Sequence, residues 1–513
     1  MEFDQIQSDR TDVIIIGAGV AGLTAGLHLA ERGLSPLILE ADPAFVGGRL
    51  AGGERVKLGD WEFRAEHGVH GVWSSYRNLQ AMLARHHIRP TFIPSNEETW
   101  IYKRGKRVRR AKVGSALRRS WLPAPLHYLN LFIRPSFLRM LDIRDLLALP
   151  IVWGGLVWGL GIDPMAEDQA LEGMYLDSLV KYWPPAVRAF FVGLARNGLS
   201  ASPEEIPLSG FISFLRFYSL LRRDAWAFTY MPDDGGTSVC EPLAGRVREL
   251  GGRIVLDTPV KGIEKLAEEG FRITYMKQGR AHTIRCSQLV VAADVTNAEK
   301  LLAASPSLTH DKPFYWPRGM ETAVVRVWFN KQPKPGAESG ILTGDFALHN
   351  FFWLDKLYGD YRQWSRQTGG SAVEAHVYNP GELETKSDEE LLVRAVADLR
   401  SAFPELRGAR IHQTITRNPV RHTMIEVGPR GRHLTVRSPW EGLFFCGDWV
   451  NDPAPAFFIE RACLTGMLAA NAVLEARRLE PWKTLPYPQP EAFAGWIEKL
   501  MMRGRKKRVE RRK

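Results

Sequence analysis

Three glycines near the N-terminus, Gly17, Gly19 and Gly22, have the spacing G-x-G-x-x-G that can hold a nucleotide pyrophosphate. In this pattern the first glycine permits a tight turn, the second lets the backbone approach the phosphates, and the third lets a helix pack closely on the preceding strand. Glu40 follows at about the twenty-residue distance at which such sites bind the adenosine ribose. The spacing predicts a dinucleotide site; the alternative is a glycine-rich turn without a ligand.

A second group has the residue types needed for proton transfer. Glu66, His67 and His70 lie close together in the chain. A positioned imidazole or carboxyl can orient a substrate or move a proton near neutral pH. Alternatively, these side chains bond backbone carbonyls and shape the loop. We take the three residues as catalytic candidates, with both interpretations open.

Regular elements must position the three glycines. Residues 13–16 are β-branched without polar alternation, which is typical of a strand buried on both faces of a parallel sheet. Residues 21–32 then have a helical pattern, and the N-terminus of such a helix favours an anion. A second strand at 37–39 ends at Glu40. The order strand, glycines, helix, strand and acid predicts a Rossmann-type domain.

The residues Gly47-Gly48-Arg49 add a second glycine signature. It resembles the one found in the flavin amine oxidase and phytoene desaturase superfamily. The resemblance implies that the cofactor is FAD, that the backbone at Gly47 and Gly48 passes near the diphosphate, and that Arg49 helps to hold it. An ordinary loop is the alternative.

The stretch 63–79 resembles a narrower group. Its pattern E-H-G-x-H-G, followed by Y-x-N-L, is similar to that of the isorenieratene synthase group of carotene desaturases. Members of that group convert a β-ring of a carotene into an aromatic ring. This chain departs from the group's pattern at Val69 and Val72, where phenylalanines are expected, and this leaves the end group of the substrate open.

The C-terminal part resembles the same group. Residues 443–450 (LFFCGDWV) predict a buried strand ending at Gly447 and Asp448, and residues 460–471 predict a helix that carries Gly466. The resemblance implies that Asp448 meets the diphosphate and ribityl region and that the helix faces the flavin. A strand at 253–260 ends at Val260, whose backbone meets the adenine in the resembled family.

These signatures predict an α/β fold, α+β overall, in which a Rossmann-type FAD-binding domain is interleaved with an α+β substrate domain. A chain of 513 residues is long enough for two such cores. The expected FAD-binding segments are 1–90, 230–310 and 426–480. The expected substrate-binding segments are 91–229 and 311–425. Residues 481–513 would form an amphipathic helix and a basic tail.

The four cysteines, scattered without C-x-x-C spacing, predict neither a disulfide framework nor a metal site. They favour a reducing compartment. The polar, acid-containing N-terminus does not have the pattern of a signal peptide. We therefore expect a cytoplasmic protein.

The net charge of +11 is concentrated in residues 103–119 and 503–513. No nucleic-acid-binding module accompanies these basic runs, so nucleic acid is not an expected partner. Before the basic tail, apolar residues recur with helical spacing at Phe493, Trp496, Ile497, Leu500 and Met501. An amphipathic helix followed by basic residues is typical of peripheral binding to an anionic membrane. The alternative is a helix packed on the body, followed by a solvated tail.

Residues 146–162 are the most apolar stretch. They fall short of the roughly 20 residues that a spanning helix needs, and they contain Pro150 and four glycines. The sequence favours a buried helix over a shallow membrane-dipping segment, without separating the two.

Together, the resemblance and the apolar composition predict an FAD-dependent oxidoreductase that removes hydride from a long isoprenoid hydrocarbon. The expected substrate is a carotene, with a ring-aromatising enzyme as the specific form. The alternatives are a dehydrogenase or isomerase of another lipid, such as a squalene derivative, and a non-catalytic carotenoid-binding flavoprotein. The electron acceptor is not indicated by the sequence.

Overall fold

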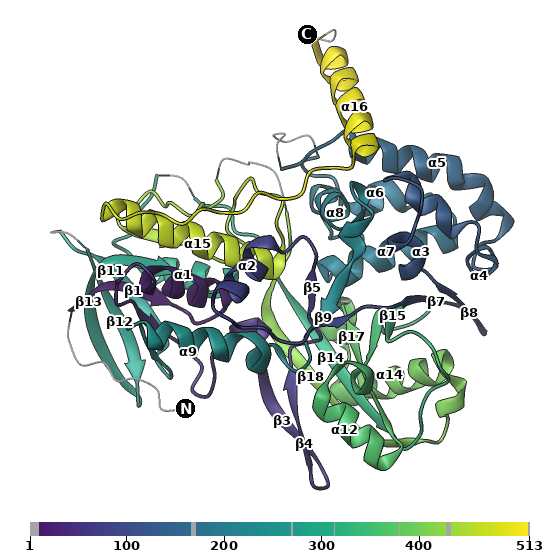
Figure 1. The fold of residues 1–513 in the computed structure, drawn as a ribbon, viewed down its shortest axis with the longest axis horizontal. Helices are drawn as coiled ribbons and strands as arrows, with labels where there is room; N and C mark the ends of the chain where they lie inside the picture. The colour runs from purple at the N-terminus through teal and green to yellow at the C-terminus, as the bar shows by residue number, and fades with distance from the viewer. Residues whose placement is uncertain are drawn as a thin grey trace.

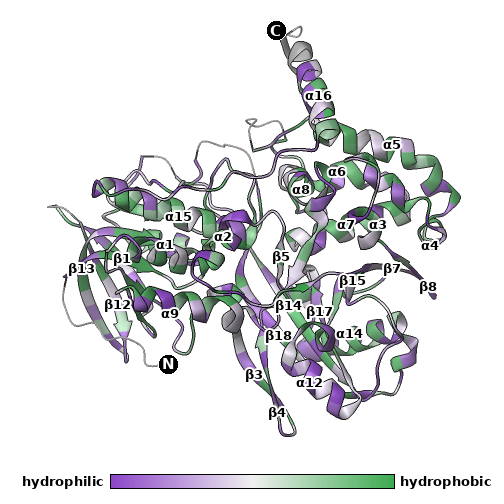
Figure 2. Cartoon of the chain, viewed as in Figure 1, coloured by the Kyte–Doolittle hydropathy of each residue, from purple (hydrophilic) through white to green (hydrophobic). Residues whose placement is uncertain are grey.

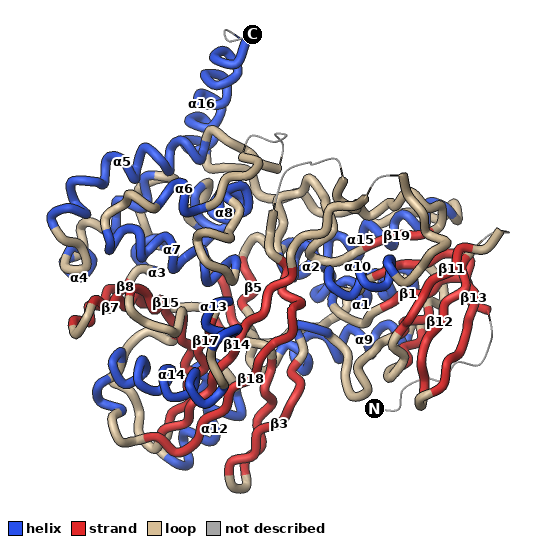
Figure 3. The backbone as a smooth tube through the Cα atoms, turned by 180° about the vertical axis from the view of Figure 1, so that it is seen from behind, coloured by secondary structure: helices blue, strands red, loops and turns tan. Residues whose placement is uncertain are grey.

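In the computed structural model, two seven-stranded sheets lie side by side, and a helical region covers one end of the second sheet (Figure 1). The structure describes residues 10–165, 171–267, 270–311, 313–378, 380–426 and 432–510. Figure 3 shows the two sheets from behind as separate groups of strands.

The first sheet has the strand order β10-β2-β1-β13-β12-β11, with β19 also paired to β13. Strands β10, β2, β1, β13 and β19 are mutually parallel, and β12 and β11 continue the sheet in antiparallel fashion. Its strands are β1 (Arg10–Ile16), β2 (Leu37–Leu39), β10 (Arg253–Val255), β11 (Val260–Lys265), β12 (Phe271–Lys277), β13 (Arg280–Val291) and β19 (Leu443–Phe445). Its helices are α1 (Val20–Ala30), α2 (Arg77–Arg85), α9 (Glu241–Glu249), α10 (Val295–Ala303) and α15 (Phe458–Ala476).

Two strand predictions were wrong in detail. Residues 253–260 do not form one strand, because the chain turns at Asp257, whose φ is +54°, and crosses from the β2 edge to the β12 edge. Val260 therefore begins β11 instead of ending a strand. Strand β19 ends at Phe445 because Gly447, with φ +146°, already belongs to a turn.

The second sheet joins segments that are far apart in the sequence, in the order β18-β14-β17-β16-β15-β7-β8. Its strands are β7 (Glu98–Arg104), β8 (Arg107–Lys112), β14 (Gly319–Phe329), β15 (Ser339–Gly344), β16 (Asn350–Trp353), β17 (Ser371–Val377) and β18 (Arg410–Thr423). The helices beside it are α11 (Leu354–Leu357), α12 (Gly359–Thr368), α13 (Pro380–Thr385) and α14 (Asp388–Ala402). The fold is thus a Rossmann-type α/β domain with a second α+β layer; the exact domain bounds stay a prediction.

Short strands connect the two sheets. The hairpin β3 (Gly52–Leu58) and β4 (Trp61–Glu66) follows the second glycine signature. Through Phe63 it packs on Tyr361 of α12, at 4.2 Å between ring centroids, and on Trp328 of β14 in the second sheet, at 5.9 Å. A three-stranded sheet follows, made of β5 (Gly71–Trp73), β9 (Phe228–Tyr230) and β6 (Ile93–Pro94). The segment 66–71 therefore lies between the two halves of the molecule.

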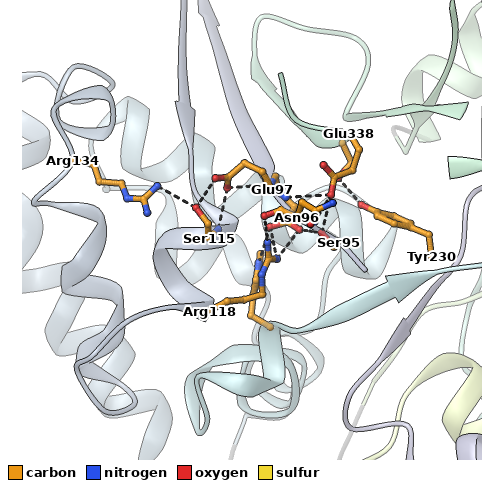
Figure 4. A network of polar contacts seen from close by, with 11 residues as sticks. Ser95, Asn96, Glu97, Ser115, Arg118, Arg134, Tyr230 and Glu338 are labelled. Carbon is orange, nitrogen blue, oxygen red and sulfur yellow. Dashed lines mark hydrogen bonds and ion pairs between the residues drawn. The ribbon is translucent and has the colours of Figure 1, made fainter. Parts of the chain in front are cut away.

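The helical region inserts between β8 and β9. It comprises α3 (Gly114–Arg118), the 3-10 turn η2 (Leu126–Leu131), α4 (Pro135–Leu138), α5 (Ile143–Leu160), α6 (Leu176–Val180), α7 (Pro185–Leu199) and α8 (Leu208–Leu215). A polar network ties it to the second sheet (Figure 4). Arg118 donates to the buried Glu98 carboxylate at 2.8 Å and to the Asn96 carbonyl at 2.6 Å, and Tyr230 meets Ser339 at 2.7 Å.

The prediction that residues 146–162 form a buried helix was wrong, because most of α5 is not buried. Only 28% of this 18-residue helix is buried, and its mean hydropathy is 1.4. Within the described ranges it is the one helix that is long and apolar enough to cross a membrane, by length and composition alone.

The C-terminal helix α16 (Ala492–Glu510) projects from the body next to α5 (Figure 1). The predicted apolar stripe is divided between two environments. Ile497 packs against the core of the helical region, and Met501 lies against Gly161. Trp496 and Leu500 are 60% and 55% exposed. Part of the stripe therefore packs on the body and part of it faces outward, and membrane binding by the exposed part stays a prediction.

Candidate cofactor site and active site

The first glycine turn lies at the carboxyl end of β1, as the sequence predicted. Gly17 donates its N–H to the Leu39 carbonyl at 2.8 Å, and a Cβ on Gly22 would lie 1.9 Å from the Gly17 carbonyl oxygen. Gly17 has φ +102°, and a Cβ there would lie 2.9 Å from the Ala292 carbonyl oxygen, so both glycines are required by the protein's own packing. Gly19 differs, because no protein atom lies within 4 Å of where its Cβ would be. This open space at the N-terminus of α1 suits an anionic ligand.

Glu40 lies at the end of β2 and turns back toward the glycines. Its carboxylate accepts hydrogen bonds from the backbone N–H groups of Ala18 at 2.6 Å and Asp42 at 2.9 Å, and burial raises its pKa. Thr258 donates to the Glu40 carbonyl at 2.8 Å, which places the turn before Val260 beside the same strand end. Glu40 and the Val260 turn thus share one edge of the sheet with the glycines.

The second glycine signature lies along the first. Gly47 has φ +113° and Gly48 has φ +55°, both in the left-handed region that favours glycine. Gly47 donates its N–H to the Ala18 carbonyl at 2.8 Å. Arg49 pairs with Asp448 at 2.6 Å, and this pair joins the N-terminal and C-terminal signatures.

Gly466 has a packing explanation. A Cβ at this position would lie 2.5 Å from the Ala21 carbonyl oxygen, so the glycine lets α15 pack closely on α1. Its predicted contact with the cofactor stays a prediction.

Glu66 is buried at the end of β4, where its carboxyl group meets the Tyr358 hydroxyl and accepts from the Gly235 N–H at 3.0 Å. Burial, together with the nearby Glu374 carboxylate, raises the pKa of Glu66 to about 8. The group is therefore protonated at neutral pH. A protonated carboxyl can orient a substrate or donate a proton, and the catalytic role of Glu66 stays a prediction.

The two histidines differ in their partners. His67 shares a hydrogen bond of 3.0 Å between Nδ1 and the Ala51 carbonyl, so Nδ1 carries the proton and Nε2 keeps a lone pair. Burial lowers the pKa of His67, and it lowers that of His70 to about 4. Nδ1 of His70 is buried without a hydrogen-bond partner in the described part of the chain. Both imidazoles are neutral at neutral pH.

The second sheet supplies groups that the sequence reasoning missed. Arg326 on β14 and Glu374 on β17 form a buried ion pair of 2.8 Å. Glu374 also accepts from the Val69 N–H at 2.6 Å and shares a 2.8 Å contact with Nε2 of His376. Although burial opposes ionisation, Arg326 and His376 lower the pKa of Glu374 to about 2. The pair anchors the segment that carries Glu66 and His70.

His422 and Thr423, at the end of β18, were also missed. Thr423 donates to Asp448 at 3.2 Å. Burial lowers the pKa of His422 to about 4, and its Nε2 has no hydrogen-bond partner among the residues that the structure describes. No motif marks these residues, because their position is set by the pairing of β18 with β14.

These residues fit FAD. The space at Gly19 and the cation of Arg49 suit a diphosphate, and Glu40 lies where a ribose is expected. The unpartnered Nε2 of His422, near Arg49 and Asp448, points to a polar group of the cofactor at this place. In the described ranges, no group of three or more His, Cys, Asp or Glu side chains could hold a metal ion, and the four cysteines are buried and unpaired.

Comparison with known proteins agrees with an FAD-binding fold. The model of the flavin containing amine oxidoreductase family matches residues 20–474. The chain is 27% identical over 491 residues to a carotenoid phi-ring synthase of Streptomyces griseus, covering 91% of this chain and 88% of that protein. It is 24% identical to a 15-cis-phytoene desaturase of Narcissus pseudonarcissus, covering 90% and 79% of the two chains. Cyclohexylamine oxidase from Brevibacterium oxydans shares the fold, with a TM-score of 0.66 at 17% identity over 91% of this chain and 99% of the other.

Proposed function

The chain belongs to the flavin containing amine oxidoreductase family, and from this premise we propose that it is an FAD-dependent desaturase of a carotene whose specific reaction is aromatisation of a ring. The observation that carries the proposal is the similarity to carotenoid phi-ring synthases over about nine-tenths of both chains. The buried segment 66–71 at the junction of the two sheets supports it.

The site's protonation states suit a hydrocarbon substrate. When bound, FAD supplies the acceptor for the hydride that a dehydrogenation removes. A proton must leave the substrate as well, and the neutral imidazoles of His67, through Nε2, and of His70 can accept it. Protonated Glu66 holds its place through Tyr358 and Gly235. Burial of these groups keeps water away from a carbocation formed by hydride loss.

Anaerobic mixing of the FAD-loaded protein with a β-ring carotene tests the proposal. We expect bleaching of the flavin absorbance on mixing, which reports the first two-electron oxidation. A β-ring must lose two hydride–proton pairs to become aromatic and one FAD accepts one hydride, so we expect the aromatic product only when an added electron acceptor reoxidises the flavin. If another isoprenoid bleaches the flavin and the carotene does not, the substrate is a different lipid. If carotene binds without bleaching, the protein is a carotenoid-binding flavoprotein.

A carotene dissolves in the bilayer rather than in water, so we also propose peripheral membrane association on the cytoplasmic side. The exposed residues Trp496 and Leu500 of α16 support a contribution from the C-terminal helix. At 1 M salt the Debye length falls to about 3 Å, so the electrostatic part of such binding should weaken while the apolar part remains.

A further inference from the structure

Exposed large apolar side chains are concentrated in one part of the molecule. Of the seventeen such residues within the described ranges, nine lie between residues 121 and 158, in the helical region and the turns before it. They are Trp121, Leu129, Ile133, Leu138, Ile143, Leu146, Leu147, Ile151 and Trp158. Scattered apolar residues are normal on a protein surface, but a contiguous group indicates an interaction surface.

Helix α5 shows the concentration most clearly. Ile143, Leu147 and Ile151 recur every four residues on one helical face and are 69%, 73% and 70% exposed. The opposite face, which includes Leu156 and Leu160, is buried in the helical core. A helix between a protein core and water is polar on its outer face. Most residues of α5 are hydrophobic (Figure 2), and Ile143, Leu147 and Ile151 are exposed on its outer face, so this face is suited to a medium other than water.

The same region and the hairpin before it are strongly basic. Residues 103–160 contain twelve Lys and Arg against two Asp, in a protein whose net charge is +11. The turn of the β7–β8 hairpin meets the N-terminus of α5, where Arg104 and Arg109 contact Asp142 at 3.4 and 3.0 Å. Helix α4 packs on β8. Basic side chains therefore adjoin the apolar face.

Helix α16 extends this surface at the other end of α5. Met501 lies against Gly161, directly after the last residue of α5, and Glu498 pairs with Arg216. Trp496 and Leu500 remain exposed beside this junction.

We infer that the outer face of α5, continued by Trp496 and Leu500 of α16 and bordered by the basic β7–β8 hairpin, is a docking surface for an anionic phospholipid bilayer. Apolar side chains would enter the region between headgroups and acyl chains, and basic side chains would meet the lipid phosphates. A second copy of the chain is a poorer occupant, because it would bring the same excess of positive charge against this one. The inference specifies the surface for the membrane association proposed above, and it rests on the proposed function for the identity of the substrate. The surface itself is inferred from the exposed apolar side chains and the basic residues beside them.

The test compares matched substitutions in the full-length, FAD-loaded protein. Ile151→Glu and Leu147→Glu place a charge on the docking face. Val393→Glu is the control, because Val393 on α14 is 68% exposed but lies outside this region. Co-sedimentation with vesicles of phosphatidylcholine and phosphatidylglycerol is measured. We expect about a tenfold lower partition coefficient for each α5 variant, since one buried aliphatic side chain contributes a factor of that order, and no change for Val393→Glu.

Three outcomes would overturn the inference. The first is that Ile151→Glu and Leu147→Glu bind vesicles as well as the wild type. The second is that removal of residues 492–513 abolishes binding while the α5 variants keep it, which would make α16 the anchor. The third is that the wild type is a dimer without lipid and Ile151→Glu is a monomer, which would assign the face to a second copy.

A detergent assay separates this inference from the proposed function. With substrate dissolved in detergent micelles, Ile151→Glu should bleach its flavin at the wild-type rate, and with substrate in vesicles it should be slower. If no carotene bleaches the flavin in either form, the proposed function fails while the vesicle-binding result still decides the docking surface. Equal rates for the variant and the wild type in vesicles would contradict the role of this face in substrate uptake.

Discussion

The glycine edge of the first sheet and the segment 66–71 are built in different ways. At the glycine edge most contacts join residues close in the sequence, such as Gly17 with Leu39 and Ala18 with Glu40. The segment 66–71 depends on residues about 300 positions away, since Glu66 meets Tyr358 and Val69 meets Glu374. The glycine turns of the cofactor edge are therefore encoded locally, and Arg49 adds one contact to Asp448, 399 positions away. The candidate chemical site exists only once the two sheets have assembled.

The two regions also differ in charge. Ionic groups, Arg49 and Asp448, meet at the cofactor edge, where a diphosphate is expected. At the segment 66–71 the titratable side chains facing the junction are neutral, with Glu66 protonated and His67 and His70 unprotonated. Behind them lies the compensated pair of Arg326 and Glu374. A neutral surface is suited to an apolar substrate, because no uncompensated charge is desolvated when it binds.

The largest effects are expected for substitutions of two glycines at the cofactor edge, and the two should differ in kind. Gly22→Val should prevent folding, because its side chain would overlap the Gly17 carbonyl, which belongs to the backbone and cannot move aside. Gly19→Val should fold and remain soluble but lose FAD, because its side chain would occupy open space meant for the ligand. Circular dichroism and the ratio of flavin to protein absorbance measure the two effects. Stoichiometric flavin in Gly19→Val would contradict the assignment of this space.

The sequence could predict the cofactor edge because each part of it is a short pattern with a backbone reason. The three glycines, Glu40, Arg49 and Asp448 all lie at one end of the first sheet, as expected from the parallel order of its strands. The glycine spacing alone predicted a dinucleotide, and the resemblance to the flavin amine oxidase and phytoene desaturase superfamily identified it as FAD.

The rest of the site has no such local pattern. Arg326, Glu374 and His422 reach it through strand register, and register depends on contacts that span the chain. The sequence also could not predict which face of α5 is exposed, for a related reason. Hydropathy indicates that a helix is apolar, but only the packed structure shows which of its faces lacks a partner.

The second prediction concerns the imidazoles at the segment 66–71. His70→Ala should bind FAD normally and lose about 10² to 10⁴-fold in the rate of flavin bleaching by substrate, the usual contribution of a positioned base. Because the pKa of His70 is lowered to about 4, the wild-type rate should be level between about pH 5 and pH 7, below the ionisation of Glu66, and fall as the imidazole gains a proton near pH 4. His28→Ala is the matched control, since His28 is also buried with a pKa of about 4 but bonds the Thr24 carbonyl within α1. A wild-type rate in His70→Ala would leave His67 as the acceptor.

The third prediction tests whether the second sheet holds the segment in place. Glu374→Gln should lower the free energy of unfolding by about 3–5 kcal/mol, because it leaves the Arg326 cation buried without its partner. Arg326→Met combined with Glu374→Leu should cost less than Glu374→Gln alone. The exposed pair of Arg55 and Glu62 on the β3–β4 hairpin is the control, and its loss should cost less than about 1 kcal/mol. Urea unfolding measures all three, and equal costs for the buried and exposed pairs would contradict the anchoring role.

The smallest effect is expected at Glu66. Since its carboxyl is protonated at neutral pH, Glu66→Gln should keep flavin and near wild-type bleaching rates at pH 7, in contrast to a loss expected for a carboxylate base. The difference should instead appear in stability. The folded-state pKa of Glu66, about 8, lies above its ordinary value of 4.5, so the folded protein binds this proton more tightly than the unfolded chain. The contribution of Glu66 to stability is therefore complete below about pH 4.5 and is lost as the pH rises through about 8.

Comparing wild type with Glu66→Gln isolates that contribution from the histidines, whose lowered pKa values act in the opposite direction between about pH 4 and 6.5. Glu374, Asp234, Tyr358 and Arg326 face the carboxyl in both proteins and cancel in the difference. We expect the wild type to lose roughly 2–4 kcal/mol relative to the variant between pH 5 and pH 9, since each pKa unit corresponds to about 1.4 kcal/mol. Melting temperatures across this range measure it. Parallel pH profiles for the two proteins would show that Glu66 is ionised in the folded state, and the neutral character of the segment 66–71 would then have to be abandoned.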